Sequence, residues 1–329
     1  MGINCGSSKL GSGIIHQLGT ASTNFSRSNP AQSASICSQA TATINSQADA
    51  SQYASCSTIS GDVLVGPGAS GQISIDGPQQ IKGRFICQNA GGLTSLGSTT
   101  IGTITKDFTL NNLTVLSTLA MSSLSQVGSI SWTALPALSQ LTFTETVKKA
   151  TKVLITNTFL STLDGINLDT VGTLDINNNN RLTTFSTQVS NITQLLNIDS
   201  NGKNLDVSFP NLIWAANMSF RTVASVSIPS LATVNGSLGF YGNFMKSISA
   251  PNLTTVGDFA TGEGSLAFVA NSLLTNISMP LLKTVGGANQ IANNTDLTAI
   301  SFPALTSVGG AIDFSGNFTT YAFMSWHFY

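Results

Sequence analysis

Three aspartates are the strongest candidates for acid–base chemistry in this sequence. Asp175, Asp199 and Asp313 occur in the segments "LDI", "IDS" and "IDF", where strand alternation points them outward. In a stack of coils, Asp175 and Asp199 could lie in neighbouring coils, within reach for the paired-carboxylate chemistry that cleaves polysaccharides. The matching outward positions in later copies of the pattern are Gly239 and Ala267, which interrupt the row. We therefore interpret the aspartates as solvated residues of a strand face.

Other reactive side chains are scarce. The two histidines, His16 and His327, lie near the two ends of the chain, so neither a nucleophile triad nor a histidine metal site is expected on the repeat described below. Glu145 and Glu263 are isolated in the sequence. We predict no catalytic residue, no metal site and no cofactor.

Aromatic and asparagine side chains are candidates for contact with sugars. Trp132, Trp214, Phe220 and Phe240 could form a platform for sugar rings, although strand spacing places most of them in the core. Sequons for N-glycosylation are abundant, but a chain this rich in Ser, Thr and Asn produces several by chance. Several fall at predicted coil corners, where a glycan stays in solvent. We predict that some are occupied; besides Asn24, the sequons begin at Asn112, Asn191, Asn217, Asn235, Asn252, Asn276, Asn293 and Asn317.

The composition excludes several classes of function. Charged residues make up 8% of the 329 residues and the formal net charge is -1, whereas an average soluble domain has roughly 25% charged residues. The absence of a basic run argues against a nucleic-acid partner. No stretch approaches the roughly 18 consecutive apolar residues of a membrane-spanning helix. Ser, Thr, Asn and Gly fill the polar positions, which suits an extracellular protein among glycans.

A repeated phrase determines the elements that position these residues. It reads P-x-L-x-x-V, then glycine, then a short alternating run that ends at Asn, with clear copies at Pro229, Pro251, Pro280 and Pro303. Weaker copies lie upstream, and a period of roughly 20 to 30 residues predicts a solenoid. The runs "GSLGFYGN", "GTLDINNN" and "GAIDFSGN" alternate as strands with one buried face do.

The same phrase predicts the corners and the fold class. Glycine at the strand entry and asparagine at the exit are expected to supply the positive φ of tight corners, the exit residues being Asn243, Asn271, Asn294 and Asn317. We predict an all-β fold, a single right-handed parallel β-helix whose coils bury Leu, Val, Ile and Phe. A leucine-rich horseshoe is the alternative, but the prolines and the lack of a helical segment favour the β-helix.

A short helix is predicted to cap the N-terminal end. Ser46 is a candidate N-cap with Asp49 three residues on, followed by an amphipathic turn. Cys37 and Cys56 flank this segment, and a disulfide between them would pin the helix over the first coil. Spacing does not fix the connectivity of four cysteines, so Cys5 and Cys87 stay unassigned, and four reduced cysteines are the alternative.

Several segments together resemble a known family. "SCSTISGDVLV", "ISIDGPQQIKG", "SISWTALPALSQLTF", "LDGINLDTVGTLDINNN", "VSFPNLIWAANMSF", "VNGSLGFYGN" and "VGGAIDFSGNFT" are similar to the fungal GPI-anchored cell-wall organisation glycoproteins, whose repeats resemble receptor L domains. The resemblance spans residues 37–318 and implies an L-domain-like solenoid in an extracellular, glycosylated, non-enzymatic protein needed for wall assembly.

The two ends depart from that family. Residues 1–36 lack the apolar core of a secretory signal, and residues 319–329 show no repeat phase and no anchor signal. Our hypothesis is that both ends are annotation errors or truncations, so that the membrane is reached only through a GPI anchor missing from this chain.

The function predicted from the sequence is a cell-surface glycoprotein that contributes to cell-wall organisation. Its expected partners are cell-wall polysaccharides or wall glycoproteins. A glycan- or peptide-binding receptor module is the alternative, and a β-helix polysaccharide lyase or hydrolase comes third.

Overall fold

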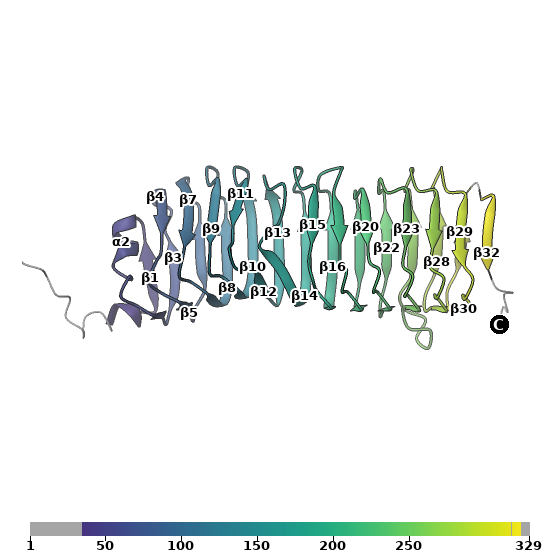
Figure 1. Cartoon of the computed structure of the whole chain (residues 1–329), viewed down its shortest axis with the longest axis horizontal. Coiled ribbons are helices and arrows are strands. Elements are labelled where there is room, and N and C mark those ends of the chain that lie inside the picture. The colour runs from purple at the N-terminus through teal and green to yellow at the C-terminus, as the bar shows by residue number, and fades with distance from the viewer. Residues whose placement is uncertain (1–34, 317, 324–329) are drawn as a thin grey trace, which may run out of the picture.

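The computed structural model describes residues 35–316 and 318–323 and shows a parallel β-solenoid. Its coils stack along one long axis from the purple N-terminal end to the yellow C-terminal end (Figure 1). The predicted all-β solenoid is confirmed, and the horseshoe is wrong because strands lie on more than one side of every stack of coils.

The main ladder joins equivalent strands of successive coils in parallel. Its strands are β1 (Thr41–Ile44), β3 (Asp62–Val65), β6 (Phe85–Gln88), β8 (Thr103–Asn111), β10 (Gln126–Leu135), β13 (Lys152–Thr158), β14 (Ile166–Asn177), β16 (Asn191–Asp199), β19 (Met218–Arg221), β22 (Leu238–Tyr241), β25 (Leu266–Val269), β28 (Asn289–Ala292) and β31 (Ile312–Phe314).

A shorter ladder precedes the main one in each coil and belongs to the same sheet. It consists of the first residues of β8, β10, β14 and β16 together with separate strands. The separate strands are β2 (Thr58–Ile59), β5 (Gln80–Ile81), β12 (Val147–Lys149), β18 (Trp214–Ala215), β21 (Thr233–Val234), β24 (Thr255–Val256), β27 (Thr284–Val285) and β30 (Ser307–Val308).

Three smaller sheets complete the coils. The first contains β4 (Ser70–Ser74), β7 (Gly92–Ser98), β9 (Thr118–Met121) and β11 (Gln140–Thr142). The second contains β15 (Thr184–Ser186), β17 (Asp206–Ser208) and β20 (Ser225–Ser227). The third contains β23 (Ser247–Ser249), β26 (Asn276–Ser278), β29 (Ala299–Phe302) and β32 (Thr320–Phe323).

The repeat phase continues past residue 318. Strand β32 pairs with β29 in parallel, with Thr320 opposite Ala299. The expectation that residues 319–329 have no repeat phase is therefore wrong for Thr320–Phe323, whose mixed sequence hides the alternation.

Inward side chains form apolar rows along the axis. Phe220, Phe240 and Phe268 are fully buried and stack in adjacent coils, with ring centroids 5.3 and 4.8 Å apart and planes within 12° and 4° of parallel. A coil on its own would expose these rows, so each depends on its neighbours for stability. Asn289 breaks one row between Leu266 and Ile312, and its buried amide has no hydrogen-bond partner among the described residues.

The corners after the main strands differ from the prediction. Positive φ falls one residue earlier than expected, at Gly242 (60°), Ala270 (58°) and Asn293 (58°). The asparagines that follow them are buried instead, and Asn271 links its neighbours through side-chain hydrogen bonds. These residues form an asparagine ladder, defined here as Asn243, Asn271 and Asn294.

Glycine at the strand entry is explained by space and not by φ. A Cβ on Gly310 would lie 2.7 Å from the carbonyl carbon of Gly287, and one on Gly287 would lie 2.8 Å from Ser265 Oγ. Neither glycine has positive φ. The close approach of successive coils therefore excludes larger side chains here.

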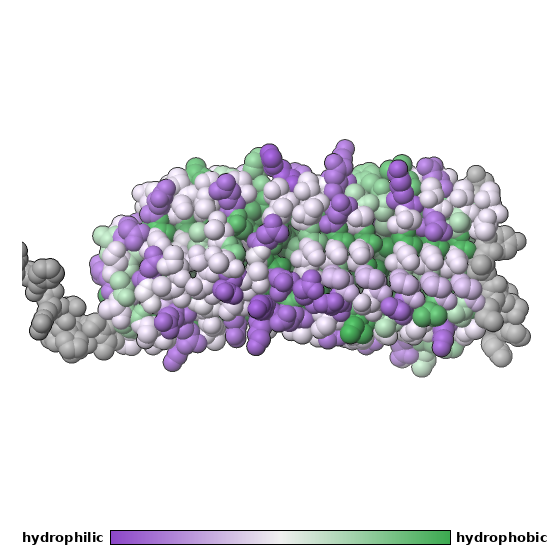
Figure 2. Space-filling view, viewed as in Figure 1, coloured by the Kyte–Doolittle hydropathy of each residue, from purple (hydrophilic) through white to green (hydrophobic). Residues whose placement is uncertain are grey.

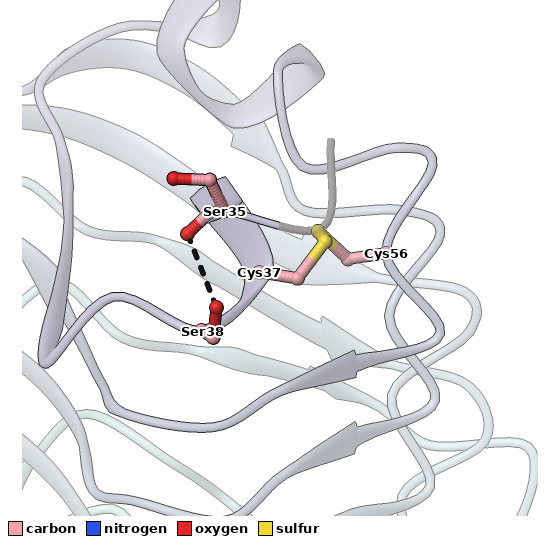
Figure 3. The surroundings of a disulfide bond; sticks show 4 residues. All are labelled: Ser35, Cys37, Ser38 and Cys56. Atoms are coloured by element: carbon pink, nitrogen blue, oxygen red, sulfur yellow. Dashed lines mark hydrogen bonds between the residues drawn. A yellow bond between two sulfur atoms is a disulfide. The ribbon is translucent and has the colours of Figure 1, made fainter. Parts of the chain in front are cut away.

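The N-terminal cap forms as predicted. Helix α2 (Gln47–Ser51) begins after Ser46, whose hydroxyl accepts a hydrogen bond from the Asp49 amide at 3.2 Å. The Asp49 carboxylate accepts in turn from the Asn45 amide at 2.9 Å, and these contacts lower the pKa of Asp49. A disulfide joins Cys37 and Cys56 across the segment that contains β1 and α2 (Figure 3).

Candidate functional site

The structure separates the aspartates that the sequence suggested as a catalytic pair. Asp175 lies opposite Asn197 in the main ladder, whereas Asp199 lies opposite Asn177. The expected stacking of Asp175 on Asp199 is therefore wrong, because Asp199 is two positions further along its strand than Asn197. Asp313 stands opposite Gln290, far along the same outward row as Asp175.

The environment of Asp175 is that of a structural carboxylate. Its Oδ1 accepts hydrogen bonds from Asn177 Nδ2 and Asn197 Nδ2, both at 2.8 Å. Asp199 accepts from the hydroxyl of Ser200 at 2.9 Å. Neutral amides and hydroxyls surround both groups, so the arrangement lacks the second carboxylate that glycoside hydrolysis requires.

Aspartates elsewhere are held in the ionised form. The Arg84 guanidinium, 2.7 Å from Asp62, keeps the pKa of that carboxyl below its ordinary value. Burial raises the pKa of Asp76, but hydrogen bonds from Ser74 and Thr99 outweigh it and lower the pKa overall. A general acid needs the opposite shift.

The other reactive residues do not gather. His16, His327 and Cys5 lie outside the described residues, and Glu145 and Glu263 are exposed. Over residues 35–316 and 318–323 no three His, Cys, Asp or Glu side chains are placed to hold a metal ion. Within the same ranges no helix is long and apolar enough to cross a membrane.

The buried thiol of Cys87 belongs to the core. It occupies an inward row between Val65 and Leu110. Burial raises the pKa of this thiol to about 12. A thiol in that environment stays protonated and unreactive near neutral pH.

Most of the candidate aromatic platform is core, as strand spacing predicted. Trp132, Phe220 and Phe240 are completely buried. Trp214 is the exception: it is half-buried on β18, and its Nε1 donates a hydrogen bond to Asn235 Oδ1 at 3.1 Å.

A second surface aromatic was missed by the sequence reasoning. The Tyr241 ring lies over Gly239, where any Cβ would overlap it, and the Arg221 guanidinium carbon is 4.4 Å from the ring centroid. The signal was available, because the outward glycine two residues before the tyrosine leaves room for its ring.

The described sequon asparagines are all at least partly accessible. Asn112, Asn217, Asn235, Asn252 and Asn293 are exposed, and Asn191 and Asn276 are half-buried on strands. Asn112 and Asn293 have positive φ at coil corners. Asn24 and Asn317 lie outside the described residues.

Outward rows of small hydroxyl side chains run along the solenoid. We call the row Thr233, Thr255, Thr284 and Ser307 the hydroxyl face; these residues are paired in register and half-buried. A second row, Ser249–Ser278–Ser301, follows the third small sheet. The side of the molecule in Figure 2 is largely pale, with isolated hydrophilic side chains.

A hollow lies beside the cap helix. Its volume is about 370 Å³, and its lining includes Gln47, Gln72, Ser74, Ser95, Gly97 and Ala120. The floor is low because Ser74, Gly97 and Ala120 are in register and small. A Cβ on Gly97 would lie 2.8 Å from the Ala120 carbonyl oxygen. Gln47 forms one wall and is fixed by two hydrogen bonds to the Ser74 backbone.

Comparison with known proteins gives fungal relatives. The chain is 48% identical over 279 residues to protein ecm33 of Aspergillus fumigatus, covering 84% of this chain and 68% of that protein. It is 44% identical over 254 residues to a cell surface GPI-anchored protein of Arthroderma benhamiae, covering 77% and 64%. It is 35% identical over 250 residues to cell wall mannoprotein PST1 of Saccharomyces cerevisiae, covering 76% and 54%.

The chain thus spans between 54% and 68% of the length of these curated relatives. No family model matches the sequence. No solved structure matches it.

Proposed function

Because this chain belongs to the fungal family of GPI-anchored cell-wall proteins and is a protein of the cell surface, we propose that it acts without catalysis. In this proposal it is a scaffold that contacts neutral wall polysaccharides or wall glycoproteins through its hydroxyl face. Glycans at some of its sequons would keep the remaining surface in solvent.

The hydroxyl face is the observation that carries the proposal. Thr233, Thr255, Thr284 and Ser307 stand in one outward row, and successive strands of a sheet are about 4.8 Å apart. A neutral polysaccharide offers hydroxyl donors and acceptors along an extended chain. Hydroxyls on a flat surface can exchange hydrogen bonds with such a chain without the large cost of desolvating a charge.

Two further observations support a role without catalysis. Asp175 and Asp199 stand in different outward rows, each bonded to neutral groups. The relatives are named for their place at the cell surface or in the wall.

Co-sedimentation with insoluble wall polysaccharide tests the proposal. The double variant Thr255→Arg/Thr284→Glu covers the hydroxyl face with a paired, net-neutral bulk, and Ser278→Arg/Ser301→Glu makes the same change on the second row. Loss of about two hydrogen bonds predicts roughly tenfold weaker binding by the first variant only. Equal binding by both variants would refute the role of this face.

The hollow beside α2 favours a receptor module as the second candidate. Its volume of about 370 Å³ is within the roughly 300–1,000 Å³ of small-molecule sites. Titration with soluble wall oligosaccharides and with peptides tests this function, using Ser95→Trp to fill the hollow. Saturable binding that Ser95→Trp abolishes would support a receptor, and binding unaffected by that change would exclude this hollow.

A further inference from the structure

Trp214 is the half-buried aromatic that bonds to a sequon. It stands on β18 in register with Asn191 on one side and Thr233 on the other. Its Nε1 reaches the following coil and donates to Asn235 Oδ1 at 3.1 Å. Among the described residues this is the one hydrogen bond between an aromatic side chain and a sequon asparagine.

The bond leaves the reactive atom of Asn235 free. Trp214 occupies the amide oxygen, and Asn235 Nδ2 has no acceptor within the described ranges. Other sequons differ, since Asn112 Nδ2 donates to Asn89 Oδ1 at 2.7 Å and Asn252 Nδ2 donates to the Pro229 carbonyl at 2.8 Å. Asn235 is also exposed, so a group on its nitrogen would enter solvent beside the indole.

We propose that Asn235 carries an N-linked glycan whose first sugar packs against Trp214. The inference rests on the proposed function, because it requires a chain exposed to glycosylation. In the reaction Nδ2 attacks C1 of an oligosaccharide activated as a lipid pyrophosphate. The N–C1 bond forms, the C1–O bond breaks, the lipid pyrophosphate leaves, and Nδ2 loses one proton.

The product keeps the existing contact. The glycosylated amide retains its oxygen, so Asn235 Oδ1 still accepts from Trp214 Nε1 and the linkage is held in one orientation. The indole offers an apolar surface with a polar edge, which suits the apolar side of a sugar ring next to its amide. The glycan would stand at the N-terminal end of the hydroxyl face, because Trp214 is in register with Thr233.

The experiment compares variants of Ser237, the third residue of the sequon. Ser237→Ala removes the sequon and leaves both Asn235 and Trp214, whereas Ser237→Thr preserves it. The full chain is secreted from a fungal host, glycopeptides are identified by mass spectrometry, and hydroxyl-radical footprinting measures the oxidation of Trp214. Phe259, which is 51% exposed, is the internal reference.

A control separates the glycan from the side chain of Ser237. Ser237 Oγ accepts from the Ser265 amide at 3.1 Å, so Ser237→Ala also loses a structural contact. Wild type and Ser237→Ala are therefore compared again after production in a host that does not glycosylate. There the two proteins should show equal oxidation of Trp214.

We expect a glycan on Asn235 and a loss of Trp214 oxidation in wild type and Ser237→Thr relative to Ser237→Ala, with Phe259 unchanged. An unmodified Asn235 in a protein glycosylated at other sequons would overturn this inference and leave the proposed function intact. An occupied Asn235 with unprotected Trp214 would also overturn it. A secreted protein with no occupied sequon would count against the glycoprotein role itself.

Discussion

Replacing Asn271 by alanine tests the asparagine ladder. The Asn271 side chain is fully buried. Its Oδ1 accepts from the Asn243 backbone amide and from Asn243 Nδ2, both at 2.9 Å. Its Nδ2 donates to the Phe240 carbonyl and to Asn294 Oδ1, both at 3.0 Å. One side chain therefore ties three coils together.

The expected cost follows from the groups that lose their partners. In Asn271→Ala the Asn243 amide loses its acceptor and the Phe240 carbonyl loses a donor inside the protein. Asn243 Nδ2 still donates to the Phe220 carbonyl, and Asn294 Oδ1 still accepts from the Asn271 amide. Two stranded backbone groups at about 1–3 kcal/mol each predict a loss of about 2–6 kcal/mol in the free energy of unfolding.

The assay is urea denaturation combined with amide hydrogen exchange of the coils around residue 271, because a solenoid can unfold in parts. Asn211→Ala is the matched control, since exposed Asn211 makes one side-chain bond, to Gln188 Oε1 at 2.7 Å. The control should lose about 1 kcal/mol or less. If Asn271→Ala were no more destabilising than Asn211→Ala, the ladder would not be a structural element.

Four further changes have defined outcomes. Cys56→Ser opens a bridge with a sequence separation of 19 and should cost about 3 kcal/mol, measured by denaturation and seen first as faster hydrogen exchange at α2; unchanged exchange would contradict the pinning role. The lowered pKa of Asp62 stabilises the fold above its unfolded value near 3.8, so stability should fall as pH drops through the folded pKa; in a pH series of melting temperatures Asp62→Asn should weaken that fall, and an identical profile would refute the linkage. Cys87 should resist alkylation at neutral pH until urea unfolds its coil, and rapid labelling of native protein would disagree with its burial. Asn289→Leu should raise the free energy of unfolding by about 1–3 kcal/mol, since it removes a buried amide without partners, and a loss of stability would show that the amide is satisfied.

The coils could be predicted from the sequence because burial imposes a visible period. Pro229, Pro251, Pro280 and Pro303 mark equivalent turns, and the alternating runs after them are strands β22, β25, β28 and β31. The cap helix was likewise visible in Ser46 and Asp49, since capping depends on local contacts.

The corners could not be read in the same way. The positions with positive φ hold Gly242, Ala270 and Asn293, three residue types with no shared signature. The asparagine that follows is selected by buried carbonyl and amide groups on neighbouring coils, and sequence alone does not place those groups. Spacing was therefore right while the reason for the asparagine was wrong.

Register explains the failure of the paired aspartates. Strands β14 and β16 shift register between Val171 and Thr173, where β16 has an additional residue. Counting from apolar neighbours does not reveal which strand contains such a bulge. The shift places Asp175 beside an amide. Trp214 and Tyr241 were equally hard to place, because each depends on a small neighbour in space.

The most direct test of the central claim is sedimentation of the full chain with purified, uncharged wall polysaccharide at low and high salt. Neutral hydroxyl contacts predict binding that is nearly independent of ionic strength, since little charge is screened. Binding that disappears at high salt, or no binding at either salt, would contradict a scaffold that meets the wall through its hydroxyl face.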